Sequence, residues 1–236
     1  MNINEHINSK KALIMGNGPS LDTIDFDLLK SSKVSTFACN RIAKICKKNN
    51  WYPDFYAAFF AEPFRGTPKY PGTAEQAIAA REDINFVVEN KKTMCHLHHW
   101  YKNFLPMTSN VKLHDPVLVN RHQKLNIDVF ENYKTPEYFL WHLAVTPLFQ
   151  LCFEMGFEEI AIIGQDGHKI GSFNHFKDYT GPDQDQKKME RGNNRISNLQ
   201  DAVKKYADNN NVSIVNLSST SIIKHYPIVE IKEYLK

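Results

Sequence analysis

The chain has 236 residues, of which 42% are hydrophobic and 12% aromatic, enough for the core of a globular domain and too much for a disordered or fibrous protein. Lysine and arginine total 29 against 26 acidic residues. Because the net charge is only +3, we expect no nucleic-acid partner.

Apolar runs alternate with helical patterns through the first 90 residues. The predicted strands there cover residues 11–15, 34–39, 53–60 and 84–88. The predicted helical segments cover 21–29, 42–48 and 73–80, the last with Thr73 as its N-cap. This alternation of strands with helices is typical of a parallel sheet.

The second part of the chain begins with residues 90–135, where prolines, histidines and asparagines interrupt every pattern and predict loops and short strands. A helix is expected over 138–155, started or kinked by Pro147 and closed by Gly156. Further on we expect a strand over 160–163, a mobile lid over 168–195, a helix over 199–207, a strand over 212–217 and a helix over 228–235. The fold class is thus α/β, a doubly wound, Rossmann-like, mostly parallel sheet with a small lid region, in one domain over 1–236.

The cysteines and the most apolar stretch indicate the compartment. Residues 138–153 contain a proline and a histidine and fall short of the roughly 18 apolar residues of a membrane span. The first residues are polar and lead directly into an apolar run, unlike a signal peptide. We expect a cytoplasmic protein with no integral membrane segment and with reduced, unpaired cysteines: Cys39, Cys46, Cys95 and Cys152.

The turn from Gly16 to Ser20 follows the first strand, where a doubly wound sheet binds ligands. Gly16 and Gly18 allow the backbone to approach a ligand, and Asn17 and Ser20 offer hydrogen bonds to a phosphate or a ribose. The turn is not a GxGxxG motif, because Leu21 occupies the third glycine position. The structural alternative is a tight turn that starts a helix.

Polar residues also end the later strands. Asn40 is a candidate contact for a nucleobase or sugar, or an ordinary turn residue. Glu62 has the same place after the third strand and is equally well explained as a solvated carboxylate. Gly164 and Asp166 end the strand at 160–163, where Asp166 either binds a ligand hydroxyl or caps the next turn.

His175 lies in the expected lid and is a candidate general base, although a loop histidine is more often inert. A basic stretch nearby is placed to meet phosphates, or else forms a solvated face with its interleaved acids: Lys187, Lys188, Arg191 and Arg195.

Three histidines, His96, His98 and His99, have spacing that a metal can use, but no carboxylate or thiolate pattern completes the site. We therefore expect no metal site. The chain has no Walker A motif, GxSxG elbow or HExxH motif, which counts against a P-loop kinase, an α/β-hydrolase and a zincin. Nucleotide-linked transfer chemistry remains.

Four segments, 12–21, 37–41, 155–166 and 174–176, together resemble the bacterial sialyltransferase-like superfamily and its neighbour, the MptE-like (6-hydroxymethylpterin diphosphokinase-like) proteins. The resemblance spans about residues 11–180 and implies a GT-A-variant, sialyltransferase-like form of the Rossmann-like fold. MptE-like proteins occur among genes for surface polysaccharide, which favours glycosyl transfer.

The resemblance also implies roles for individual residues. Asn17 and Asn40 match the asparagines that hold a CMP-sugar donor, and His175 matches the histidine base. Thr146 falls where the superfamily has a Ser/Thr-Gly donor contact, although the glycine is missing. Gly167 and His168 stand where it has tyrosines that support the departing phosphate.

We therefore expect an inverting, metal-independent glycosyltransferase that moves sialic acid or a related sugar from a CMP-activated donor to a glycan hydroxyl, with no cofactor beyond that donor. His175 would be the catalytic base. The donor would contact Gly16, Asn17, Gly18, Ser20, Asn40, Thr146, Gly164 and Asp166, and the leaving phosphate Lys177, Tyr179 and Arg191.

Two alternatives remain open. One is Mg²⁺-dependent diphosphate transfer from ATP to a pterin alcohol, with Glu62, Asp166 and Asp178 as candidate metal ligands. The other is a non-catalytic protein that binds a nucleotide or a glycan. The sequence gives no oligomeric state.

Overall fold

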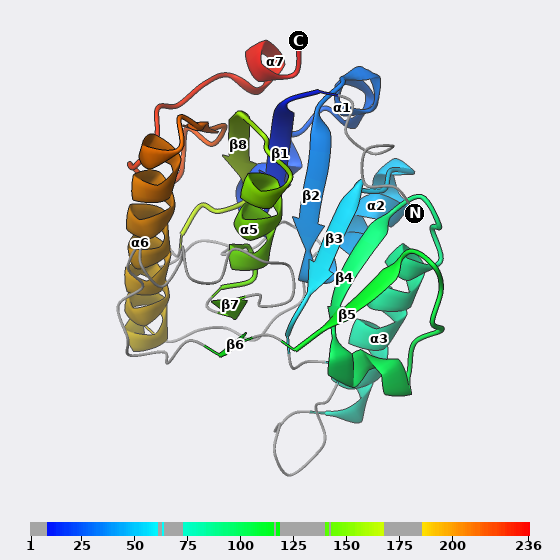
Figure 1. Ribbon diagram of the computed structural model, residues 1–236. Coiled ribbons are helices and arrows are strands. Elements are labelled where there is room, and N and C mark those ends of the chain that lie inside the picture. Colours follow the sequence, from blue (N-terminus) through cyan, green and yellow to red (C-terminus); the bar gives the residue numbers. More distant parts are fainter. Residues whose placement is uncertain are drawn as a thin grey trace.

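A computed structural model describes residues 9–60, 63, 73–115, 117–118, 140–141, 143–167 and 186–236. Its centre is a seven-stranded, all-parallel sheet with helices on both faces (Figure 1). The strands are β1 (Lys11–Met15), β2 (Ser35–Cys39), β3 (Phe55–Ala58), β4 (Met94–His98), β5 (Val111–His114), β8 (Glu159–Ile163) and β9 (Ser213–Asn216). A separate parallel pair is formed by β6 (Val117–Leu118) and β7 (Leu140–Trp141).

The strand order is β5-β4-β3-β2-β1-β8-β9. The chain moves from β1 outward to β5 and then returns to the other side of β1 through β8 and β9. Met15 at the end of β1 is in register with Ala38 of β2 and Ile163 of β8. This confirms the predicted doubly wound α/β fold and places its switch point between the carboxyl ends of β1 and β8, where such sheets bind ligands.

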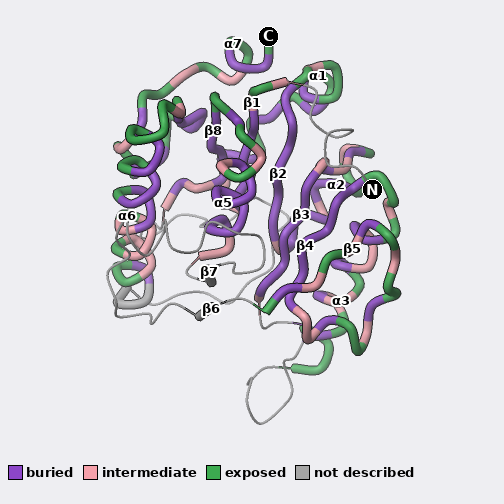
Figure 2. Tube along the Cα trace, viewed as in Figure 1, coloured by how far each residue is buried: buried purple, intermediate pink, exposed green. Residues whose placement is uncertain are grey.

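Both faces of the central strands are covered, and Figure 2 shows β2, β3 and β4 buried along their length. In β1, Ala12 and Ile14 face one apolar cluster, and Leu13 and Met15 face the other. The first cluster includes side chains of α5 (Thr146–Glu154) and α6 (Gln186–Asn209). The second includes side chains of α1 (Phe26–Ser31), α2 (Ala43–Asn49), α3 (Ala74–Val88) and α7 (Ile231–Tyr234). Strands buried on both faces explain the continuous apolar runs in the sequence.

The strand predicted at 84–88 is wrong, because these residues are the last turns of α3. Ile84, Val87 and Val88 are buried on the helix, so tertiary packing overrides the strand preference of β-branched residues. The predicted N-cap is confirmed, since Thr73 forms a capping box with Gln76. The fourth strand is instead β4, whose histidines interrupt the apolar pattern that would have predicted a strand.

The helix predicted over 138–155 is too long at its beginning: α5 starts at Thr146, with Pro147 in its first turn. Its end is confirmed, because Gly156 follows with a φ of 72°.

The loop expected as far as Arg195 is helical from Gln186, while residues 168–185 lie outside the described part of the chain. Apolar residues at helical spacing, such as Met189, Leu199 and Val203, give α6 a buried stripe despite its polar composition. No helix among the described residues is long and apolar enough to cross a membrane.

Candidate functional site

A cavity of about 200 Å³ lies at the switch point of the sheet. Its walls come from three strand-end loops, from the segment that leads into α5, and from α6. These parts contribute residues 16–18 after β1, 39–40 after β2, 164–167 after β8, 143–145 before α5, and Ile196. The cavity therefore occupies the place that the topology assigns to a ligand.

The loops after β1 and β8 interlock through their glycines. The Gly16 amide donates to the Ile163 carbonyl at 2.8 Å, and the Gly18 amide donates to the Gly164 carbonyl at 2.7 Å. A Cβ at Gly16 would overlap the Gly164 carbonyl oxygen, and Gly164 itself has a φ of 71°. The glycines are thus required by the contact between the two loops, and the amides of Gly16 and Gly18, which we expected to hold a nucleotide, bond to protein carbonyls.

Ser20 and Asp166 join this junction. The Ser20 amide donates to Asp166 Oδ2 at 2.9 Å, and the Ser20 hydroxyl accepts from the Gly164 amide at 2.9 Å. The other Asp166 oxygen accepts from the hydroxyl of Ser218, which follows β9. Asp166 lines the cavity and is buried, with 4% of its surface exposed. Both of its oxygens therefore hold protein groups, so its observed role is to fix three loops to one another.

Asn17 is the clearest candidate ligand contact. Its Nδ2 atom donates to the Cys39 carbonyl at 3.4 Å, which orients the side chain against the end of β2. Its Oδ1 atom is buried and has no hydrogen-bond partner among the described residues. A buried unsatisfied acceptor costs about 1–3 kcal/mol, so a ligand with an N–H or O–H donor would gain from this position.

The end of β2 forms the adjoining wall. Asn40 has a φ of 52°, a left-handed conformation that asparagine tolerates, and its carbonyl accepts from the Tyr56 hydroxyl at 2.6 Å. Burial raises the pKa of the Cys39 thiol to about 12, and the hydrogen bond from Asn17 offsets only part of this shift. Cys39 is therefore a neutral wall residue and not a nucleophile.

Thr146 stabilises one wall of the cavity and does not itself line it. Its hydroxyl accepts from the Leu143 amide at 3.0 Å, and the residue is fully buried. This bond fixes the segment 143–145, which lines the cavity. The threonine predicted as a donor contact thus acts on its own chain and leaves an apolar surface for the ligand.

Sequence reasoning missed the polar contribution of α6. Gln200 is fully buried and donates to Gln165, which lines the cavity. Gln200 Oε1 has no hydrogen-bond partner among the described residues. Gln165 precedes the predicted site residue Asp166, so its position in the sequence could have indicated it. No nearby sequence pattern connects Gln200 with this site.

The other predicted residues are not brought to the cavity by the described structure. Arg191 is exposed on α6 and does not line the cavity. The remaining candidates lie outside the described residues: Glu62, His168, His175, Lys177, Asp178 and Tyr179.

Comparisons with known proteins identify a family and a shared fold. A family model described as "6-hydroxymethylpterin diphosphokinase MptE-like" matches residues 1–169. No curated protein matches the chain.

Solved structures of two Campylobacter jejuni sialyltransferases are similar to the whole chain. CstII in complex with cytidine-5'-monophosphate has a TM-score of 0.54 at 15% identity, covering 95% of this chain and 86% of the enzyme. CstII with CMP-3FNeuAc also has a TM-score of 0.54 at 15% identity and covers 97% and 89%. The monofunctional alpha-2,3-sialyltransferase Cst-I has a TM-score of 0.51 at 17% identity, covering 98% and 82%. At these identities the likeness shows a shared fold.

Proposed function

Because the chain belongs to the 6-hydroxymethylpterin diphosphokinase MptE-like family and has a sialyltransferase-like fold, we propose that it is a glycosyltransferase with a CMP-activated sugar as its donor. The transferred sugar is sialic acid or a related sugar, and the acceptor is a glycan hydroxyl. The reaction inverts the anomeric centre and uses no metal ion.

One observation carries the proposal: in a cavity at the switch point, the buried Oδ1 atom of Asn17 has no hydrogen-bond partner among the residues that the structure describes. An amine or hydroxyl of a nucleoside supplies the donor that this oxygen lacks. Solved structures of CstII, which shares the fold, are complexes with the substrate analogues cytidine-5'-monophosphate and CMP-3FNeuAc. The corresponding ligand here is a cytidine nucleotide, with Asn17 and Asn40 at its polar edges.

The chemistry needs a base and a stabilised leaving group. In the proposed step the acceptor oxygen attacks the anomeric carbon, its proton passes to His175, and the bond from that carbon to the phosphate oxygen breaks to release CMP. Lys177 and Tyr179 would balance the charge that grows on the departing phosphate. The described cavity supports a metal-free route through its donor set, because both oxygens of its one carboxylate, Asp166, already accept hydrogen bonds from the protein.

Binding of CMP to the full chain tests the role of Asn17. Asn17→Ala should weaken CMP binding about tenfold, in line with the loss of one buried hydrogen bond. Asn49→Ala is the matched control, because Asn49 bonds to Ile45 within α2, away from the cavity. Equal affinity of the Asn17 variant and the control would contradict the proposed contact.

Transfer activity tests the base. His175→Ala should lower the rate of sugar transfer about 10²–10⁴-fold while CMP binding persists. A variant with full transferase activity would show that another group removes the proton.

The family description favours a second candidate, Mg²⁺-dependent diphosphate transfer from ATP to a pterin alcohol. This reaction predicts binding of ATP that depends on Mg²⁺ and activity that a chelator abolishes. The two candidates are thus separated by the nucleotide and by the metal.

A further inference from the structure

A group of histidines lies at the carboxyl ends of β4 and β5, outside the cavity. His98 ends β4 and His99 follows it, while His114 ends β5 in register with His98 and is followed by Asp115. The strand β3 separates β4 from β2, so about 10 Å separates this group from the cavity wall at the end of β2. The group is therefore a second feature of the same sheet edge.

Three potential metal-ligand atoms converge there. One ring nitrogen from each of His98 and His99 and one carboxylate oxygen of Asp115 lie within 4.8 Å of one another. His99 Nδ1 lies 3.3 Å from Asp115 Oδ1. The Nδ1 atom is buried, and although Asp115 is near, it makes no hydrogen bond to any described residue. Two ligands of a tetrahedral zinc ion, each about 2.05 Å from it, lie about 3.3 Å apart.

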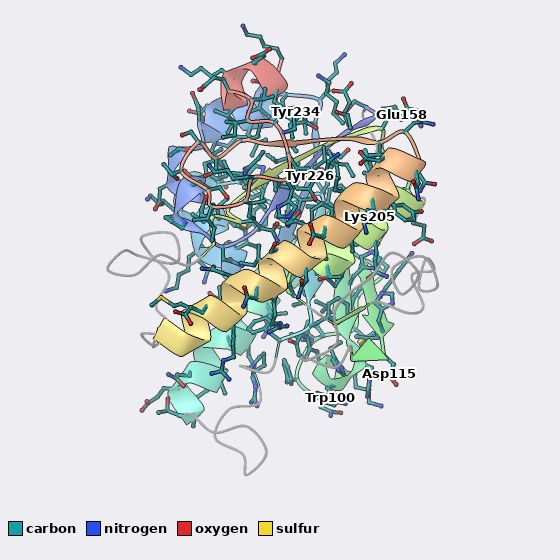
Figure 3. The ribbon with its side chains drawn as sticks, turned by 90° about the vertical axis from the view of Figure 1, so that its left-hand side faces the viewer. Trp100, Asp115, Glu158, Lys205, Tyr226 and Tyr234 are labelled. Atoms are coloured by element: carbon teal, nitrogen blue, oxygen red, sulfur yellow. The ribbon has the colours of Figure 1, made fainter. Side chains whose placement is uncertain are left out.

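The surroundings hold one side of the group rigid and leave the other open. The His98 ring is buried against Trp100, with the ring centroids 4.1 Å apart, and the Trp100 amide donates to His98 Nδ1 at 3.2 Å. The Asp115 side chain is 84% exposed. Figure 3 shows Trp100 and Asp115 at the same end of the molecule. An ion held here would keep positions open for water.

We propose that His98, His99 and Asp115 bind a divalent transition-metal ion of the zinc type. Two imidazoles with one carboxylate suit zinc and its neighbours, whereas Mg²⁺ prefers oxygen ligands alone. The site is independent of the proposed transfer reaction, which places no metal in the cavity.

The hydrogen bond at His98 sets the strength of binding. Nδ1 accepts from the Trp100 amide, so a neutral His98 ring carries its proton on Nε2. A metal ion bound at His98 Nδ1 breaks the hydrogen bond from the Trp100 amide, and a metal ion bound at Nε2 replaces the proton on that nitrogen. Either exchange costs free energy, and the described part of the chain supplies three ligands at this place. Binding is thus weaker than at a four-ligand structural zinc site, and a chelator removes the ion without unfolding the protein.

Calorimetric titration of the full chain, free of affinity tag and treated with a chelator, with zinc chloride tests the site. Asp115→Asn and His99→Ala should each lower the zinc affinity at least tenfold. Co²⁺ should give a visible absorption band that Asp115→Asn removes, and Mg²⁺ should not compete. Because Asp115 is exposed, circular dichroism of Asp115→Asn should match that of the wild type.

Asp201→Asn is the matched control, because Asp201 Oδ1 lies 3.1 Å from His225 Nε2 and no third ligand joins this pair among the described residues. It should bind zinc as the wild type does. Wild-type zinc affinity in both Asp115→Asn and His99→Ala would overturn the proposal, since the ion would then bind elsewhere. Equal loss of affinity in Asp201→Asn would overturn it as well.

Discussion

At the scale of single residues, the glycine turn combines two tasks that sequence reasoning treated as alternatives. Gly16 and Gly18 line the cavity, and their amides also lock the turn against the loop after β8. Space between the loops is so small that neither position admits a side chain. In the proposed function the ligand contacts the side chain of Asn17, whose backbone is held between two fixed glycines. Fixing this backbone beforehand reduces the entropy lost on binding.

Gly18→Ala should destabilise the protein by about 1–3 kcal/mol and abolish nucleotide binding, because the new Cβ overlaps the Asp166 carboxylate and the Gly164 carbonyl. Urea unfolding and CMP titration measure the two effects. Gly156→Ala is the control: Gly156 has a φ of 72° but no close neighbour, so that variant should lose stability through backbone strain and still bind the nucleotide. An alanine at position 18 that leaves stability unchanged would contradict the close packing.

Asp166→Asn should cost about 1–3 kcal/mol of unfolding free energy, because an amide offers one acceptor where Asp166 serves the Ser20 amide and the Ser218 hydroxyl. A double-mutant cycle with Ser218→Ala should give a coupling energy of about 0.5–3 kcal/mol. Additive effects of the two substitutions would show that the contact between them contributes nothing to stability.

At the scale of elements, an ion pair fixes the segment after β2 to α3. Arg41 Nε lies 2.6 Å from Asp83 Oδ2, and their side chains are 10% and 7% exposed. Lys47 of α2 also reaches Asp83, at 3.6 Å. Arg41 directly follows Asn40 of the cavity wall, so this buried pair holds the wall in place.

Asp83→Ala should therefore destabilise the protein by about 3–5 kcal/mol, since it leaves the buried Arg41 charge without its carboxylate. Asp27→Ala, which removes the exposed pair with Lys30, should cost less than about 1 kcal/mol. Thermal or urea unfolding of both variants provides the measurement, and similar losses in the two would refute the importance of burial.

Central strands made of apolar residues were predictable, and elements that depend on distant partners were not. β1 and β8 appear as apolar runs because each face of a central parallel strand meets helices. β4 was missed because His96 and His98 are buried polar residues, whose environment includes His114 of the neighbouring strand. In the site, the positions of Asn17 and Asp166 were predictable, because each residue lies just after the end of a predicted strand.

The partners of these site residues did not follow from any local pattern. Ser218 and Gln200 reach the site from the last third of the chain through contacts between distant residues. The carboxylate of Asp115 likewise meets His99 only because β4 and β5 pair side by side. Local periodicity carries no information on such pairings.

At the scale of the whole molecule, the family match ends at residue 169, but the fold does not. Beyond it, α6 adds Leu199, Ala202 and Val203 to one core, and β9 extends the sheet next to β8. The hydroxyl of Ser218 donates a hydrogen bond to the carboxylate of Asp166, which lines the cavity. The N-terminal part of the chain thus depends on its C-terminal part for core and for cavity.

A fragment of residues 1–169 should therefore fail to form a stable native state. Without α6 it exposes a large apolar surface on one face of the sheet, at a cost of about 25 cal/mol per Å². Circular dichroism and a urea transition measure this directly. A cooperative transition of the fragment equal to that of the full chain would show that the matched region folds by itself.

The cavity takes its walls from both of these parts, so a ligand bound there should stabilise the entire chain. CMP at 100 times its dissociation constant adds about 2.7 kcal/mol, which corresponds to a rise of about 5–10 °C in the unfolding midpoint of a protein of this size. A thermal-shift series of CMP, UDP, GDP and ATP, each with and without Mg²⁺, measures the effect. Stabilisation by CMP without Mg²⁺ is the expected outcome under the sugar-transfer proposal. A shift with ATP and Mg²⁺ alone would instead select diphosphate transfer, because that chemistry requires a metal ion to bridge the phosphates.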